Sequence, residues 1–220
     1  MCPLPALHVY EDIKPHSAAM NMAIDEALLE SATAPSLRFY GWRQPSLSFG
    51  YFGRYADVSE HENEREIVRR WTGGGIVLHG ADLTYSVILP TRDREPLSPS
   101  REIYAEIHEA IRVALSHEVA AALAAGDAPK VSDACFANPV AADVLVDGRK
   151  IAGAAQRRTR AGLLHQGSIQ YEHLPHGFRE AFASAICPSF EMRSVPPEAI
   201  ERATDFAHTK YGTPEWICRR

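Results

Sequence analysis

Three consecutive glycines follow a pair of arginines in the segment Arg69–His79. Because Gly73, Gly74 and Gly75 carry no side chains, a ligand can approach the backbone N–H groups there closely. A guanidinium group from the arginine pair could hold a carboxylate or a phosphate. The spacing matches neither a dinucleotide-binding fingerprint nor a P-loop. The segment therefore indicates a site for an anionic group, with a plain hairpin turn carrying solvated arginines as the alternative.

A lysine followed by small residues is the second feature that could take part in catalysis or binding. The turn Asp147-Gly148 is a strong hairpin signal, and Lys150 opens the strand after it. Gly153 and Ala154 occur where a packed strand would carry larger side chains, which leaves room beside the lysine. Such room suits an acyl chain or a carbonyl group, although most lysines are solvated surface charges. The strand after it ends in polar residues, His165-Gln166-Gly167, a weak signal by itself.

Cys135 lies in an irregular stretch, residues 126–141, within the sequence Ser-Asp-Ala-Cys-Phe. A thiol with an ordinary pKa of ~8.5 is mostly protonated at neutral pH, so a nucleophilic cysteine needs a basic or cationic neighbour. Lys150 or a histidine could supply that neighbour if the fold brings it close. An incidental thiol is the alternative.

The elements that would position these residues follow from hydrophobic periodicity. Strands come in runs that helices interrupt irregularly, which predicts an α+β fold with a mixed or antiparallel central sheet flanked by helices. The clearest helix has Ile103, Ile107, Ile111, Leu115, Val119 and Leu123 at every fourth position. We expect helices over 17–31, 99–124, 174–185 and 197–210, and strands over 37–42, 47–50, 67–71, 76–79, 84–89, 143–146, 150–155 and 163–170.

The composition sets limits on function. The 220 residues are 45% hydrophobic and 23% charged with a net charge of −5, which fits one folded domain over 1–220 and argues against nucleic-acid or anionic-membrane partners. The sequence shows no secretory signal and no apolar run long enough to span a membrane. The four cysteines lack paired spacing, which favours a cytoplasmic location, and no His or Cys cluster has the spacing of a metal site.

In combination the motifs resemble those of the biotin/lipoate A/B protein ligase family. The resemblance rests on the arginine, triple-glycine and histidine segment, on the Arg149–Ala154 lysine strand and on the histidine-glycine strand at 165–167. Weaker matches are Asn21–Glu26, Lys210–Gly212 and Glu215-Trp216, so the resemblance covers nearly the whole chain. Cys135-Phe136 occupies the position where the single-domain, cysteine-dependent octanoyltransferase branch, which is similar to lipoate-protein ligase A, carries its nucleophile.

The family resemblance implies a catalytic domain like those of biotin ligases and class II aminoacyl-tRNA synthetases, without a C-terminal accessory domain. It implies catalytic roles for Cys135 and Lys150, the lysine contacting the acyl carbonyl. Cys187 ranks second as nucleophile, because the other octanoyltransferase branch keeps its cysteine near that position. The His-Gln-Gly order at 165–167 departs from the family pattern and puts one polar contact in doubt. Substrate binding is expected from Arg70, Gly73, Gly74, Gly75, His79, Gly153, Ala154, His165 and Gly167.

The implied reaction is transfer of octanoate from octanoyl-acyl carrier protein to a lysine of a lipoyl-carrier domain, either the glycine-cleavage H protein or the E2 subunit of a 2-oxoacid dehydrogenase. No cofactor is then required. Arg157, Arg158 and Arg160 are candidates for docking an acidic carrier, with a solvated basic strand end as the alternative. Three alternatives remain: a ligase that uses ATP and Mg²⁺, an amidotransferase between carrier domains, and a binding module without turnover.

Overall fold

An eight-stranded mixed sheet forms the centre of the computed structural model, which describes residues 6–91, 97–116, 118–129 and 138–219. Strand β1 runs parallel to both of its neighbours, and the other strand pairs of this sheet are antiparallel. This arrangement confirms the expected α+β fold. In sheet order the strands are β11 (Phe190–Arg193), β1 (Leu7–His16), β2 (Ser36–Trp42), β6 (Leu83–Pro90), β10 (Gly162–Ile169), β9 (Arg149–Arg158), β8 (Val144–Val146) and β7 (Ala121–Leu123).

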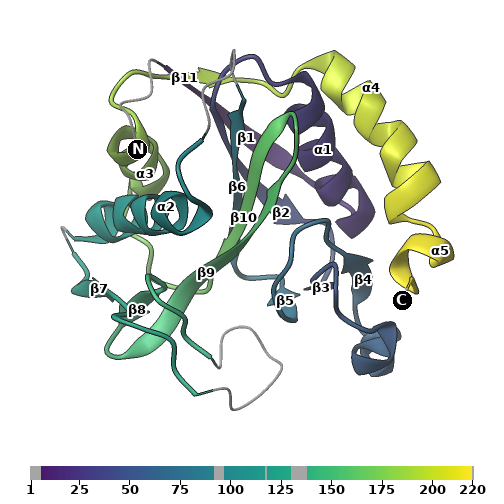
Figure 1. The fold of residues 1–220 in the computed structure, drawn as a ribbon, viewed down its shortest axis with the longest axis horizontal. Coiled ribbons are helices and arrows are strands. Elements are labelled where there is room, and N and C mark those ends of the chain that lie inside the picture. Colours follow the sequence, from purple (N-terminus) through teal and green to yellow (C-terminus); the bar gives the residue numbers. More distant parts are fainter. Residues whose placement is uncertain (1–5, 92–96, 117, 130–137, 220) are drawn as a thin grey trace.

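Helices cover both faces of the sheet (Figure 1). Helices α2 (Ser100–Leu115) and α3 (Phe178–Ile186) contact each other on one face, while α1 (Ala18–Ser31) and α4 (Pro197–Phe206) contact each other on the opposite face. Successive side chains of a strand point to opposite faces, so Val87 joins the core under α2 and α3, and Ile88 joins the core under α1. Strand β6 is buried on both faces, and its second half is correspondingly apolar from Val87 to Leu89.

A second, three-stranded sheet carries the glycine-rich segment. Its order is β4 (Glu66–Arg69), β3 (Ser46–Phe49), β5 (Val77–His79), so β3 separates the two strands that the glycines connect. A connection between strands that are not neighbours cannot be a plain hairpin turn, and that alternative is wrong. Two short 3₁₀ turns, Tyr55–Asp57 and Ser59–His61, lie between β3 and β4.

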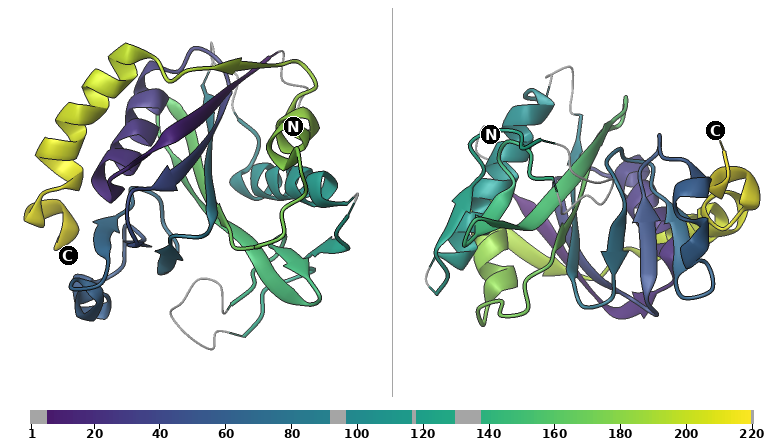
Figure 2. Two further views of the ribbon diagram at one scale, coloured as in Figure 1. Left: turned by 180° about the vertical axis from the view of Figure 1, so that it is seen from behind. Right: turned by 90° about the horizontal axis from the view of Figure 1, so that it is seen from below.

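The C-terminal segment returns to this small sheet. Helix α4 continues into a π-helical turn, Ala207–Tyr211, and then into α5 (Pro214–Ile217). The buried guanidinium of Arg69 donates to the carbonyl oxygens of Trp216, Ile217 and Arg219 at 2.7–3.1 Å. It also donates to the carbonyl oxygens of Tyr51 and Gly53 in the loop after β3. One side chain thus ties the tail to the loop, and both views of Figure 2 show α5 beside the small sheet.

The structure confirms several local predictions and corrects others. Asp147 and Gly148 both have positive φ, 49° and 74°, as a two-residue hairpin turn requires, and Val146 pairs with Arg149 across the turn. The helix expected over 99–124 ends at Leu115, and residues 121–123 instead form β7. Strands β1 and β11 were not predicted. Among the described residues, no helix has the length and apolarity that crossing a bilayer would take.

Candidate active site

The glycine-rich segment is held from inside by Arg70. Its guanidinium donates to the carbonyl oxygens of Gly73 at 3.0 Å and Gly75 at 2.8 Å, and to Ser48 Oγ at 2.7 Å. Gly74, between them, has a φ of 86°, a conformation that residues with a side chain rarely adopt. Arg70 is only 6% exposed, so it is not a solvated arginine. These hydrogen bonds from Arg70 fix the shape of the glycine segment.

His79 stands at the centre of a buried polar network. Its Nδ1–H donates to Asp82 Oδ2 at 2.8 Å, and its Nε2 accepts from the hydroxyl of Ser48 at 2.6 Å. Burial lowers the pKa of His79, which keeps the ring neutral. Burial alone would raise the pKa of Asp82, but hydrogen bonds from His79, Ser168 and the Gly80 N–H outweigh it and lower that pKa to about 2. The imidazole therefore has a fixed tautomer and a fixed orientation.

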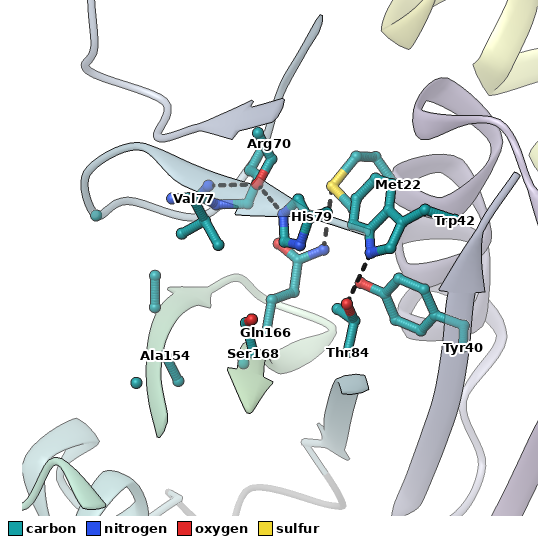
Figure 3. Close-up of a pocket in the computed structure, with 15 residues that line it drawn as sticks. Met22, Tyr40, Trp42, Arg70, Val77, His79, Thr84, Ala154, Gln166 and Ser168 are labelled. Atoms are coloured by element: carbon teal, nitrogen blue, oxygen red, sulfur yellow. Dashed lines mark hydrogen bonds between the residues drawn. The ribbon is translucent and has the colours of Figure 1, made fainter. Parts of the chain in front are cut away.

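An inner cavity lies between the two sheets, with about 400 Å³ of empty space when the part open to solvent is included. Small residues line one end: Gly74, Gly153, Ala154 and Ala155. Large side chains line the other end, where Met22, Tyr40 and Trp42 converge (Figure 3). Most of the surface between these ends is apolar. A slot of this form suits an unbranched hydrocarbon chain.

Lys150 is fixed by a buried carboxylate. Its Nζ lies 2.8 Å from Asp143 Oδ2, and both side chains are almost completely buried. The Tyr104 hydroxyl donates to Asp143 Oδ1 at 2.5 Å and accepts from the Ala154 N–H at 3.2 Å. Burial and the neighbouring carboxylate raise the pKa of Tyr104, so the phenol stays protonated and keeps donating. Lys150 is thus an oriented ammonium group and not a solvated surface charge.

The strand geometry directs this lysine over the small residues that follow it. The pairing of β8 with β9 shifts register beside Lys150, a local irregularity that re-aims side chains. A Cβ added to Gly153 would lie 2.4 Å from Lys150 Cε and 2.6 Å from Lys150 Nζ. The space above Gly153 is therefore occupied by the lysine itself.

A wider outer cavity adjoins the inner one, with about 1400 Å³ of empty space when the part open to solvent is included. Gly74 and Ala154 line both cavities, so the small-residue end of the inner cavity opens into the outer one. Lys150 and Tyr104 line the outer cavity near that junction. A chain lying in the slot would have its head group beside the Lys150 ammonium.

His165 was expected to bind substrate, but it lies away from the inner cavity. His165 is completely buried on the other side of β10, where its Nε2 lies 3.2 Å from the Tyr85 hydroxyl, and it is not among the residues lining the inner cavity. Gln166 lines the cavity instead, because neighbouring residues of a strand face opposite ways. Gly167 leaves room for Tyr85, since a Cβ there would lie 2.3 Å from Tyr85 Cζ.

Of the two candidate nucleophiles, the structure describes only Cys187. Cys135 lies outside the described residues, as does Phe136. Two described residues near the ends of residues 130–137, Ala128 and Asn138, line the outer cavity. Cys187 is 1% exposed in the core beside α3, its Sγ donates to the Ser189 carbonyl oxygen at 3.4 Å, and it lines neither cavity.

Sequence reasoning missed the partners of the residues that it found. Asp143 and Tyr104 fix Lys150, Ser48 and Asp82 fix His79, and Trp42 ends the inner cavity. Asp143 directly precedes β8 and so could have been noticed as an acidic residue at the start of the lysine hairpin. No local signal indicates Tyr104 or Trp42, because their positions depend on tertiary packing. Within the described ranges, no three His, Cys, Asp or Glu side chains gather as a metal site would require.

Comparison with known proteins identifies the family. A family described as the lipoyl protein ligase A/B catalytic domain matches residues 17–204. The chain belongs to this family. It is 40% identical over 259 residues to the octanoyltransferase LipM of Carboxydothermus hydrogenoformans, with 92% of this chain and 95% of that protein covered. The octanoyltransferase LipM of Oceanobacillus iheyensis is 38% identical over 166 residues, and this match covers 70% of the chain but only 60% of that relative.

Solved structures agree on the fold. The bipartite lipoate protein ligase of Thermoplasma acidophilum, from an archaeal lipoylation system described together with its E2 lipoyl domain, has a TM-score of 0.70 to this chain. The sequence identity is 21%, and the match covers 98% of this chain and 96% of that chain. The lipoate-ligase catalytic fold expected from the motifs is thereby confirmed.

Proposed function

We infer that the chain is an octanoyltransferase that acylates a lysine of a lipoyl-carrier domain. It is an acyltransferase of the family identified above, and its relatives of 38% and 40% identity carry the name octanoyltransferase. The observation that carries the inference is the apolar slot that opens beside Lys150, because octanoate is an unbranched chain ending in a reactive carbonyl. The acceptor class rests on the related ligase that was described with an E2 lipoyl domain.

The reaction proposed here has two steps and uses Cys135 as the nucleophile. In the first, the Cys135 thiolate attacks the carbonyl of an octanoyl thioester, a new C–S bond forms, and the donor thiolate leaves and takes up a proton. In the second, a carrier lysine amine attacks this acyl-enzyme, forming the amide and releasing Cys135, which receives the amine proton. The donor thioester is already activated, so the reaction consumes no nucleotide. We propose acyl carrier protein as the carrier of that thioester.

Lys150 is assigned to the carbonyl oxygen, which gains negative charge as the nucleophile adds. An ammonium group that is already oriented stabilises this charge without reorganising, and one such donor typically contributes ~3–4 kcal/mol. The ion pair with Asp143 and the hydrogen bond from Tyr104 supply the orientation. Gly74 and Ala154, at the junction of the two cavities, leave space for the chain to pass.

The test is to incubate the purified chain with octanoyl-acyl carrier protein and to measure its intact mass. We expect an octanoyl adduct that hydroxylamine removes, and that transfers to a lipoyl-carrier domain as a hydroxylamine-stable amide. Cys135→Ser should abolish the adduct, while Cys218→Ser, which changes an exposed cysteine, should retain it. Lys150→Met should slow adduct formation about 100-fold or more.

Three results would contradict this proposal. An adduct that survives Cys135→Ser but is lost in Cys187→Ser would assign the nucleophile to the buried cysteine. Acylation that requires ATP and free octanoate, with release of pyrophosphate, would make the chain a ligase. Transfer that starts only from an octanoylated carrier domain would make it an amidotransferase.

A further inference from the structure

We propose that His108 is a positioning residue, which holds the peptide group between Ala142 and Asp143 in the orientation that delivers Asp143 to Lys150. The inference deepens the proposed function by adding a residue to the set that orients the Lys150 ammonium, and it rests on the role assigned to that ammonium. His108 lies on α2, which packs against β7, β8 and β9, and it lines neither cavity. It therefore acts through the protein and not on the substrate.

Ala142 has a backbone conformation that alanine rarely adopts. Its φ is 67°, in the left-handed region, and it is the third residue of a turn that the Asp143 N–H closes by donating to the Val140 carbonyl oxygen at 3.0 Å. A positive φ at that place in a turn favours glycine or asparagine. Alanine is strained there, and such strain persists only where surrounding contacts hold the backbone in place.

His108 supplies one of those contacts. Its Nδ1–H donates to the Ala142 carbonyl oxygen at 2.7 Å, and the side chain is completely buried. Within the described part of the chain, the other ring nitrogen, Nε2, has no hydrogen-bond partner. A buried nitrogen without a partner costs free energy that an apolar side chain of similar size would avoid. Packing alone therefore does not account for a histidine here, whereas its hydrogen bond to the strained turn does.

A single planar peptide group connects His108 to the carboxylate that fixes Lys150. The Ala142 carbonyl, which accepts from the histidine, and the Asp143 N–H both belong to this group. The Asp143 carboxylate folds back on the turn, where its Oδ2 accepts from the Val140 N–H at 2.7 Å and lies 2.8 Å from Lys150 Nζ. A rotation of the peptide group would therefore move the carboxylate away from the lysine.

The other backbone contacts of the turn hold the neighbouring peptide groups. The Ala142 N–H donates to the Ala124 carbonyl oxygen, and the Ala124 N–H donates to the Asp143 carbonyl oxygen, both at 2.8 Å. These two bonds attach the turn to the residue after β7. They fix the peptide groups before Ala142 and after Asp143, so the oxygen of the group between them depends on His108.

The test compares variants on both sides of this hydrogen bond. His108→Leu removes the donor, and His108→Asn keeps an amide N–H near the position of Nδ1. Ala142→Gly removes the strain, because glycine adopts a positive φ readily, and it is made alone and together with His108→Leu. The control is Ile111→Val, which changes a buried residue of the same helix and lowers stability slightly without removing a hydrogen bond.

Two measurements are made on each variant. The first is acetylation of Lys150 by acetic anhydride, measured by peptide mass spectrometry relative to the exposed Lys14, and it reports on the ion pair without any substrate. The second is the rate of adduct formation over a range of octanoyl-acyl carrier protein concentrations. It separates the rate at saturating donor from the donor concentration that gives half of that rate.

We expect His108→Leu to speed Lys150 acetylation about fivefold, because the ion pair opens more often. The rate of adduct formation at saturating donor should fall about tenfold, while the half-saturating donor concentration changes less than about threefold, because the ammonium acts on charge that develops during the reaction. His108→Asn should stay close to the wild type in both measurements. Ala142→Gly should restore both in the double variant, since a glycine turn does not need the histidine.

The inference is wrong if Lys150 in folded His108→Leu is acetylated as slowly as in the wild type, or if Ile111→Val has the same effect as His108→Leu. It is also wrong if the double variant behaves like His108→Leu alone. If His108→Leu does not fold, the double variant decides: it should fold and acetylate slowly, and its failure to fold would overturn the inference. The expected acetylation pattern in a protein that forms no adduct would support the inference and reject the transferase mechanism.

Discussion

At the scale of single residues, the site depends on polar groups that are buried and already hydrogen-bonded. Lys150 reaches its position through Asp143 and Tyr104, and His79 through Asp82 and Ser48. Breaking such a contact leaves a buried group without its partner, which usually costs more free energy than the contact itself contributes. We therefore expect the site to respond to substitutions in residues that never touch the substrate.

His108 provides a pH-dependent test of this burial. Burial lowers its pKa to about 4, although its hydrogen bond to the Ala142 carbonyl oxygen opposes the shift. In the unfolded chain the pKa of a histidine is ~6.5, so between about pH 6.5 and 4 the unfolded state binds a proton that the folded state does not. The stability that depends on a neutral His108 is therefore fully present above pH ~6.5. The free energy of unfolding falls as the pH falls through this window.

The expected result is a shallower pH dependence in His108→Gln. Urea unfolding across the window should show a slope, near pH ~5, that is smaller than that of the wild type by about 1.4 kcal/mol per pH unit, the value for one proton. His79 and His165, whose pKa values burial also lowers, should maintain the remaining slope. Parallel slopes for the two proteins would show that His108 is not buried in its neutral form.

The sequence picks out those site residues whose type is unusual for their surroundings. Three glycines in a row and a lysine among alanines can be found without a structure. Their partners cannot, because Tyr104 is an ordinary helix residue and Trp42 an ordinary strand residue until the fold brings them to the cavity. The prediction placed His165 at the cavity, where Gln166 lies instead. Which of two neighbouring residues faces the cavity depends on the orientation of the whole strand, and this also follows only from the fold.

At the scale of elements, strand β9 combines a lysine with the glycine that makes room for it. Gly153→Ala would place a methyl group within 2.6 Å of the Lys150 Cε and Nζ atoms, so the flexible end of the lysine must move. We expect a loss of acyl transfer of at least tenfold, with a change in unfolding free energy of only about 1 kcal/mol.

The matched control is Gly41→Ala in β2, where an added Cβ would meet nothing within 4 Å. The adduct assay and urea unfolding, carried out on both variants, separate the effect on activity from the effect on stability. Full activity in Gly153→Ala would mean that the position of Lys150 does not limit the reaction.

Helix boundaries show why element prediction was incomplete. Apolar residues continue at every fourth position from Ile103 to Leu123, which predicts one long helix. The chain instead leaves the helix after Leu115, and β7 pairs with β8, as in the contact of Ala122 with Leu145. Pairing with a distant strand overrides the local periodicity. Strand β1 was missed because the charged residues Glu11, Asp12 and Lys14 and then Pro15 interrupt the apolar pattern of its second half.

At the scale of the whole molecule, Arg69 joins segments that are far apart in the chain. Its guanidinium has carbonyl partners in the C-terminal segment and in the loop after β3. We expect Arg69→Gln to lower the free energy of unfolding by about 2–4 kcal/mol, because several carbonyl oxygens lose their donor together. It should also increase protease cleavage near residues 214–219.

Arg202→Gln is the comparison, since Arg202 forms a half-exposed ion pair with Glu30 on the surface of α4. Exposed pairs contribute little, so this change should cost no more than about 1 kcal/mol. Urea unfolding and limited proteolysis measure both variants. Equal effects would mean that the Arg69 contacts do not hold the tail.

The position of β1 between β2 and β11 has a consequence for biosynthesis. In the register Leu7↔Phe190, β1 gains its second neighbour from a segment that the ribosome makes much later. Until then one edge of β1 presents unpaired N–H and C=O groups, and such edges promote aggregation. Nascent chains halted before β11 should therefore depend on chaperones, and acyl-transfer competence should arise only late in translation.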